Sequence, residues 1–332
     1  MSHQIDRTLA ILADVMNAHT RTLSRRGESP GPVVIPKLAE PRATLIKRVL
    51  NQLEERFGLD INKGLAEKLV RLLEPMEPSG LPAYVGTLER ASSEDPEWIS
   101  LVDRLIVGET YFLRDRDQLD FFCKTLGDLV TQAERARQFT LRFWSIGCAS
   151  GEEAFTIAAL ALRVLWARGG ATESSNAITL RDPWRIEVLG SDISRRALAQ
   201  AQQAAYETGP LSSFRNELGD LERFFPVILG SATNGSRPMR TVHPCVRSLV
   251  QFRPFNLASD PLPNVEFDVV SCRNVLVYFS PRGRRLAQER LTGAVRPGGL
   301  LLLGPTDTLA DDLAFETLWS TGAVIHRRRR RD

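Results

Sequence analysis

Two adjacent carboxylates stand at the head of a helical pattern near the middle of the chain. Glu152 and Glu153 follow Gly147–Gly151, a glycine-bounded turn with the sequence GCASG. Glycine lets the backbone approach a ligand closely, and the first turn of a helix has free N–H groups. A phosphate is not the expected ligand, because two carboxylates repel an anion and the dinucleotide spacing G-x-G-x-x-G is absent. Carboxylate acceptors suit ribose hydroxyls or a cationic ligand, or else they only complement the helix dipole.

A third carboxylate, Asp192, ends the next strand pattern. Residues 143–146 (FWSI), before the glycine turn, and 185–190 (RIEVLG), before Asp192, each predict a buried strand. Open α/β sheets bind ligands at the carboxyl ends of their strands, where an acid after the second strand accepts hydrogen bonds from the ribose of an adenosine. The sequence therefore predicts a nucleoside-binding edge. Thr110 and Arg114 lie among aromatics in 108–115 (GETYFLRD), which suits either a lid over this edge or ordinary packing.

Strand and helix patterns alternate through the rest of the chain. Further strands are predicted at 250–253, 267–271 and 300–303, a last antiparallel strand at 323–326, and helices at 195–206 and 284–295. Residues 167–183 are polar and predict a surface loop, whereas the turn-rich stretch 209–249 predicts an insertion of short antiparallel strands. This alternation predicts an α/β fold with a Rossmann-like parallel sheet covered on both faces.

The N-terminal third has a different pattern. Residues 1–22 have helical periodicity, and the prolines and glycines between 24 and 42 predict an extended linker. Helical patterns follow at 45–57, 63–73, 81–91 and 96–107, with capping residues at Asn62 and 92–95. The predicted domains are a helical extension with its linker over 1–42, a small all-α domain over 43–107 and an α/β domain over 108–332.

Composition excludes several classes of protein. The chain has 332 residues, 43% hydrophobic and 25% charged, as expected for a soluble globular protein of two domains. It contains no apolar run long enough to span a membrane and no N-terminal secretory signal. Its four cysteines and four histidines are too scattered for a metal site, and such thiols point to the cytoplasm. The net charge of +3 includes the arginine run 327–331, which we interpret as a solvated tail and not as a nucleic-acid site.

Five segments of the chain resemble the motifs of one enzyme family, in the same order. Residues 110–115 (TYFLRD) are similar to T-x-F-F-R-E, 149–153 (ASGEE) to S-T-G-E-E, 190–194 (GSDIS) to A-S/T-D-I-D, and Asn256-Leu257 to N-L-L. The most specific match sets 267–279 (FDVVSCRNVLVYF) against F-D-x-I-F-C-R-N-V-x-I-Y-F. From Ala43 onward the chain thus resembles the CheR family, S-adenosylmethionine-dependent methyltransferases that esterify glutamates of chemotaxis receptors.

The resemblance implies a class I methyltransferase sheet with a β insertion over about 209–249, and an all-α domain that docks the substrate helix. It implies S-adenosylmethionine as cofactor, S-adenosylhomocysteine as product, and Arg114 and Tyr278 as catalytic residues at the methyl-transfer site. The residues implied to hold the cofactor are Thr110, Arg114, Glu153, Asp192, Asn256, Leu257, Arg273 and Asn274. The implied partner is the helical cytoplasmic region of a chemoreceptor-type protein, bound by a monomer without nucleic acid or membrane insertion.

The chemistry agrees with these residue types. A glutamate with an ordinary pKa of about 4.3 is already an anionic nucleophile at neutral pH, so no general base is required. In-line placement of the carboxylate and the methyl group can contribute roughly 7–11 kcal/mol, and exclusion of water helps because both reacting groups lose charge. The guanidinium of Arg114 can orient the carboxylate, and the Tyr278 hydroxyl can donate one hydrogen bond.

The chain departs from the family at positions that leave two other functions open. Gly108 stands where the family usually has Asn, which removes one side-chain contact to the cofactor. The second helix of the all-α domain has only Lys63, Lys68 and Arg71 as cations, whereas receptor-specific members have an arginine-rich helix there. The alternatives are a non-catalytic S-adenosylmethionine-binding regulatory module and a small-molecule carboxyl methyltransferase.

Overall fold

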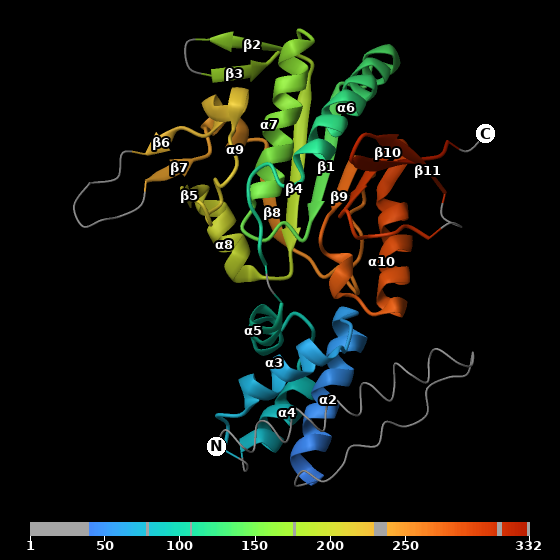
Figure 1. The fold of residues 1–332 in the computed structure, drawn as a ribbon. Helices are drawn as coiled ribbons and strands as arrows, with labels where there is room; N and C mark the ends of the chain where they lie inside the picture. The colour runs from blue at the N-terminus through green and yellow to red at the C-terminus, as the bar shows by residue number, and fades with distance from the viewer. Residues whose placement is uncertain are drawn as a thin grey trace. The chain divides into compact units, whose positions relative to one another are not determined.

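The computed structural model describes residues 40–77, 80–106, 108–174, 177–228, 238–310 and 314–330, and it divides into two compact units (Figure 1). One unit comprises the described residues between 40 and 106 together with Tyr278–Arg284. The other comprises Gly108–Val277 and Arg285–Asp332. The predicted extension and linker over 1–42 lie outside the described residues, except for 40–42.

The described part of the first unit has the four helices that the sequence predicts between 43 and 107. They are α2 (Glu40–Phe57), α3 (Lys63–Leu73), α4 (Gly80–Arg90) and α5 (Pro96–Leu105). Their apolar faces meet around Trp98, which is fully buried and donates its indole N–H to the carbonyl of Leu88 at 2.8 Å. The Asn62 side chain caps α3 as expected, but Asp95 before α5 makes no side-chain capping bond. Pro96 begins that helix instead, because its fixed φ is already helical.

A seven-stranded sheet forms the core of the second unit, in the order β11-β12-β10-β9-β1-β4-β8. The strands are β1 (Thr140–Ile146), β4 (Arg185–Asp192), β8 (Val250–Pro254), β9 (Phe267–Cys272), β10 (Val295–Leu303), β11 (Phe315–Ser320) and β12 (Ala323–Arg328). Five neighbouring strands are parallel, and β12 pairs with β10 in the antiparallel direction, as predicted. The Rossmann-like α/β fold predicted from the sequence is therefore confirmed.

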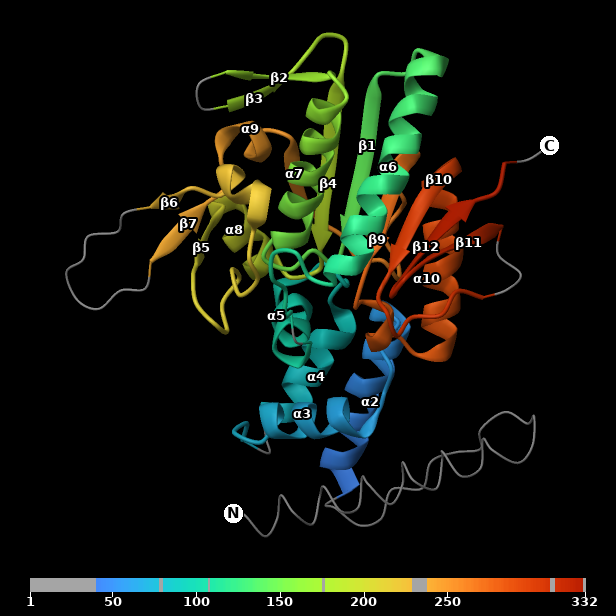
Figure 2. The same cartoon turned by 45° about the horizontal axis from the view of Figure 1, so that its top comes forward.

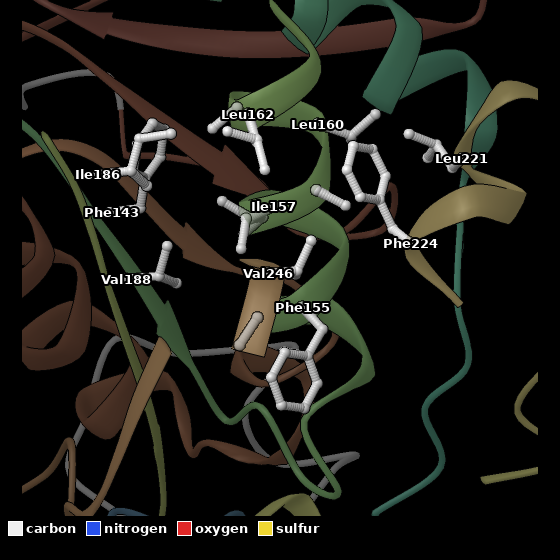
Figure 3. Close-up of a cluster of buried hydrophobic side chains, with 14 of the residues drawn as sticks. Phe143, Phe155, Ile157, Leu160, Leu162, Ile186, Val188, Leu221, Phe224 and Val246 are labelled. Carbon is white, nitrogen blue, oxygen red and sulfur yellow. The ribbon is translucent and has the colours of Figure 1, made fainter. Parts of the chain in front are cut away.

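Helices cover both faces of this sheet (Figure 2). They are α6 (Arg116–Ala136), α7 (Glu152–Ala167), α8 (Arg195–Gln203) and α10 (Pro281–Ala294). The connections through α7 and α10 run in opposite directions from the centre of the sheet, so right-handed crossovers place these helices on opposite faces. Helix α7 is apolar on nearly all sides. Figure 3 shows Ile157 facing Phe143 and Val188 of the sheet, with Leu160 turned toward Phe224.

The turn-rich stretch forms a small antiparallel sheet of β5 (Ala205–Glu207), β7 (Met239–Thr241) and β6 (Val227–Ile228), with the short helices η1 (Gly219–Phe224) and α9 (Pro244–Arg247). This insertion begins earlier than predicted, because Ala204 adopts a left-handed conformation that ends α8. The predicted surface loop over 167–183 is also wrong in part. It contains the hairpin β2 (Ala171–Ser174) and β3 (Ala177–Leu180), whose Ile178 is buried against the core.

Among the described helices, none is long and apolar enough to cross a membrane. The described residues, taken together, hold no group of three or more His, Cys, Asp or Glu side chains suited to a metal ion.

Candidate active site

The carboxyl ends of four parallel strands form one edge in the second unit. The end of β1 lies beside that of β4, with Ile146 opposite Ser191, and beside that of β9, with Ser145 opposite Ser271. The end of β8 continues the row, because Asp192 pairs with Pro254. The predicted residues Glu153, Asp192, Asn256, Leu257, Arg273 and Asn274 all lie at or shortly after the ends of these strands. The fold thus gathers them at the edge where α/β sheets bind ligands.

Asp192 joins two of the loops at this edge. One carboxylate oxygen accepts the N–H of Ala149 at 2.8 Å, and the other accepts that of Ser194 at 2.8 Å. The backbone carbonyl of Asp192 accepts the N–H of Phe255 at 3.0 Å, which ties β4 to the segment that carries Asn256. These contacts fix the direction of the side chain, and each carboxylate oxygen can accept more than one hydrogen bond.

Gly147 is required by both backbone conformation and space. Its φ is +68°, a region that side-chain-bearing residues rarely adopt, and a Cβ there would lie 2.4 Å from a methyl carbon of Val275. The turn therefore lies directly against the β9 loop that carries Arg273 and Asn274.

Replacing Gly147 with alanine is expected to destabilise the protein by about 2–4 kcal/mol, because it adds left-handed strain to a clash in a packed site. Urea unfolding measures the loss. Gly169 is a matched control, because its φ is +79° and a Cβ added there would meet nothing within 4 Å. Gly169→Ala should lower the free energy of unfolding only by the cost of the left-handed conformation, about 1–2 kcal/mol. Equal losses for the two variants would contradict the close packing of the turn.

The two glutamates at the start of α7 point to different partners. Glu152 is buried and accepts hydrogen bonds from the hydroxyls of Ser150 (2.8 Å) and Ser213 (2.6 Å). Burial raises the pKa of Glu152, and these hydroxyl bonds offset part of that rise. Glu153 accepts the hydroxyl of Ser145 at 2.6 Å and pairs with Arg273 at 3.2 Å. Both carboxylates thus hold loops together, which goes beyond complementing a helix dipole.

Arg273 is almost entirely enclosed, with 2% of its side chain exposed. One terminal nitrogen contacts Glu153, while the other lies 2.9 Å from Asp115 and donates to the carbonyl of Arg114 at 2.5 Å. Its Nε atom is buried without a partner in the described structure. The structure thereby brings together three of the predicted residues, Arg114, Glu153 and Arg273.

Arg114 lies on the segment before α6. It donates to the carbonyl of Glu109 at 3.0 Å, and its guanidinium carbon lies 5.6 Å from the centre of the Tyr111 ring. Arg215 of the insertion stacks on the same ring at 4.3 Å and pairs with Glu109 at 2.9 Å. The rest of the Arg114 fork remains available to an anion. Thr110 lies on the same segment, between Glu109 and Tyr111.

Tyr278 lies at the end of the short helix η2 (Leu276–Tyr278), in the unit that contains the four N-terminal helices. Its carbonyl accepts the N–H of Asp60 at 2.8 Å, and the following Phe279 forms a bridge with Leu59. The catalytic role given to this tyrosine by the motif stays a prediction.

The donor set of this edge fits S-adenosylmethionine. Two buried polar atoms, the Ser271 hydroxyl oxygen and the Asn274 amide oxygen, have no partner among the described residues and can serve a polar ligand. Carboxylates suit its ribose hydroxyls and its positive charges, and Leu257, which is buried, supplies an apolar surface. Asn256 is held in a turn by its side-chain bond from Ala258 at 3.0 Å.

Several residues of the site were not singled out by their sequence. Ser213 donates its hydroxyl to Glu152 at 2.6 Å, and the Asn216 amide donates to the carbonyl of Leu113 at 3.0 Å. Each pair is more than sixty positions apart in the sequence. Nothing local marks such long-range partners. Asp115 could have been found, because it ends the motif that contains Arg114.

The family model for the CheR methyltransferase, S-adenosylmethionine-binding domain, matches residues 108–324. The chain belongs to the CheR methyltransferase family. This confirms the resemblance on which the sequence prediction rested. As in that family, this CheR domain is a methyltransferase domain and its cofactor is S-adenosylmethionine.

Curated relatives agree with this assignment. A chemotaxis protein methyltransferase of Borreliella burgdorferi is 23% identical over 82% of this chain and 90% of its own length. One from Pseudomonas putida is 28% identical over 82% and 84%. An uncharacterized 104.1 kDa protein of Rhodobacter capsulatus is 31% identical over 81% of this chain, which spans only 26% of that relative. A solved TehB-like methyltransferase from Corynebacterium glutamicum has a TM-score of 0.32 and 11% identity, covering 57% of this chain and 80% of that one, a similarity too low to inform on function.

Gly108, where CheR proteins usually have Asn, has room for a side chain. A Cβ there would meet only the Cβ of Ala149, at an ordinary 3.6 Å. Gly108→Asn is therefore expected to fold normally and to bind S-adenosylhomocysteine about three- to tenfold more tightly, the effect of one added hydrogen bond. Calorimetric titration measures the change, with Gly108→Ala as the control that adds bulk but no polar group. Weaker binding by the Asn variant than by the Ala variant would contradict this prediction.

Proposed function

We propose that the protein transfers the methyl group of S-adenosylmethionine to glutamate side-chain carboxylates of a chemoreceptor-type signalling protein, giving glutamate methyl esters. The observation that carries this proposal is the position of Arg114, whose backbone is bound by a buried arginine at the ligand edge of the sheet. A guanidinium fork is suited to bind a carboxylate through two parallel hydrogen bonds. The names of the relatives, chemotaxis protein methyltransferases, support the same substrate class.

The residues around the site supply orientation and not proton transfer. The bound cofactor supplies an activated methyl group. A glutamate carboxylate is ionised at neutral pH, so the protein does not have to remove a proton from it. Arg114 orients this carboxylate, and the family motif gives Tyr278 the role of a hydrogen-bond donor to it. Holding the reactants in line can lower the barrier by roughly 7–11 kcal/mol.

The cofactor is held, in this proposal, by the residues that follow the strands. Asp192 accepts the ribose hydroxyls, because its carboxylate is already oriented by two backbone N–H groups. Glu153 would supply a carboxylate for the positively charged amino group of the cofactor. The remaining proposed contacts come from Thr110, Arg114, Asn256, Leu257, Arg273 and Asn274. The Nε of Arg273, which has no partner among the described residues, is proposed to donate to the cofactor, while the terminal nitrogens bind Glu153 and the carbonyl of Arg114.

The helical unit docks the substrate helix in this proposal, which also places a monomer in the cytoplasm. Helix α3 presents Lys63, Lys68 and Arg71 to solvent, and Lys68 also donates to the carbonyl of Leu105 at 3.2 Å. Lys63 is close to Glu67, at 3.9 Å. This weakly basic surface is suited to a receptor helix with fewer acidic residues than those bound by an arginine-rich helix.

A second candidate is a regulatory module that binds S-adenosylmethionine without transferring its methyl group. Gly108 favours this alternative, because the Asn side chain that the family usually has at this position, and that contacts the cofactor, is absent.

Transfer of labelled methyl groups to a chemoreceptor cytoplasmic fragment tests the proposal. The protein is incubated with methyl-labelled S-adenosylmethionine and the fragment, and the product is treated with alkali. We expect label on the fragment that alkali releases as methanol, because methyl esters hydrolyse readily. Cofactor binding without transfer would favour the regulatory module, and alkali-stable label would exclude esterification.

A further inference from the structure

Left-handed backbone conformations flank the proposed catalytic arginine on both sides. Leu113 and Asp115 have φ values of 56° and 55°. Two of the other non-glycine residues with positive φ, Arg137 and Ala204, end helices, where this conformation is common. Leu113 and Asp115 have no such reason. A leucine in this conformation is costly and persists only when its surroundings force it.

The contacts that impose this conformation come from outside the segment. Arg273 donates to the carbonyl of Arg114 at 2.5 Å and pairs with the Asp115 carboxylate at 2.9 Å. Asn216 of the insertion donates to the carbonyl of Leu113 at 3.0 Å. Three consecutive residues are thereby held through one carboxylate and two carbonyls, and the middle one is Arg114.

The Asp115–Arg273 ion pair is more deeply buried than an ordinary surface pair of this unit. Arg273 is 2% exposed and Asp115 31%, whereas Asp220, which pairs with Arg163 at 2.8 Å, is 64% exposed. Solvent screens an exposed pair, so removing one partner there has little effect. The Arg273 guanidinium is enclosed, so removing one of its partners leaves an uncompensated buried charge. It will then shift toward Glu153, away from the carbonyl of Arg114.

We propose that Asp115 is a positioning residue for methyl transfer: through the buried guanidinium of Arg273 it fixes the backbone of Arg114 and thereby the direction of the catalytic fork. Asp115 does not touch the reacting groups. Because the carboxylate has to be in line with the methyl group only at the transition state, misdirection of Arg114 lowers kcat more than it weakens cofactor binding. This inference rests on the proposed function and extends it to a residue outside the proposed binding set.

Asp115→Asn is the decisive variant. Asparagine adopts the left-handed conformation as readily as aspartate, so the substitution removes the charge and leaves the local backbone preference in place. We expect kcat for receptor methylation to fall at least about tenfold, while the Kd for S-adenosylhomocysteine rises by a clearly smaller factor, because Arg114 and Arg273 also belong to the proposed cofactor contacts. Asp115→Glu keeps the negative charge, so its kcat should be within about threefold of the wild-type value. Asp220→Asn makes the same change in an exposed pair and should leave kcat unchanged.

Hydrogen–deuterium exchange of the segment 108–116 provides a readout that does not need activity. The Asp115→Asn protein should exchange faster there than the wild type and the Asp220→Asn protein. Loss of cofactor affinity in proportion to kcat would overturn the proposal by making Asp115 part of the binding site, and so would failure of Asp115→Glu to recover kcat. If the wild type transfers no methyl group, the proposed function fails, and exchange alone decides whether Asp115 holds the segment.

Discussion

Arg114→Ala is expected to lower kcat for receptor methylation by about 100- to 1,000-fold, the usual effect of removing one group aimed at the transition state. The structure explains why no neighbour should replace it. Arg114 is anchored by the Glu109 carbonyl at 3.0 Å and by the carbonyl bond from Arg273, whereas Arg215 nearby already pairs with Glu109.

Steady-state methylation with saturating cofactor measures this effect. Arg114→Lys keeps the charge but loses the planar fork, so it should recover only part of the rate. Arg116 is a matched control two positions further on, because it is exposed and bonds only to the carbonyl of Glu217 among its described contacts. Arg116→Ala should leave kcat within about threefold. An Arg114→Ala protein as active as Arg116→Ala would remove Arg114 from the mechanism.

Asp192→Ala is expected to weaken the binding of S-adenosylmethionine and S-adenosylhomocysteine by about 100-fold or more. Each hydrogen bond from a ribose hydroxyl to a carboxylate contributes about 1.5–3 kcal/mol. The substitution also frees the N–H groups of Ala149 and Ser194, which the carboxylate now holds at 2.8 Å. The turn after β1 and the start of α8 will both lose an anchor.

Calorimetric titration of the wild type and the variant tests this prediction. Asp220→Ala removes an aspartate from an exposed ion pair and should bind both ligands as the wild type does. Circular dichroism shows whether the Asp192→Ala protein is folded. A folded Asp192→Ala protein with unchanged affinity would contradict the assignment of Asp192 to the ribose.

Much of the fold can be predicted from the sequence because its strands are short apolar segments that end at polar turns. The motif residues at the strand ends could be assigned to one edge, since parallel strands bring their carboxyl ends together. The family, the cofactor and the α/β fold are confirmed. The hairpin β2–β3 was missed because each strand has only four residues, β2 is largely polar, and Ile178 is buried only against the core.

The interior of the site depends on contacts between distant segments. Phe112 stacks on Phe214 with 4.3 Å between the ring centres, and Ser213 donates to Glu152. The insertion therefore holds both the segment before α6 and the start of α7. Neither pairing has a local pattern in the chain. The positive φ of Leu113 is likewise unpredictable, because leucine disfavours it and only Asn216 and Arg273 impose it. Residue types thus reveal which groups are present, but tertiary contacts decide their directions.

The central claim is that this protein forms glutamate methyl esters on a receptor. Tandem mass spectrometry of a chemoreceptor cytoplasmic fragment, after incubation with the wild-type protein and S-adenosylmethionine, tests it most directly. We expect the mass of one added methylene group on glutamate residues of the receptor helices, reduced at least about 100-fold in initial rate when Arg114→Ala replaces the wild type. A receptor that stays unmodified while the protein binds the cofactor, or a methyl group on any residue type other than glutamate, would contradict it.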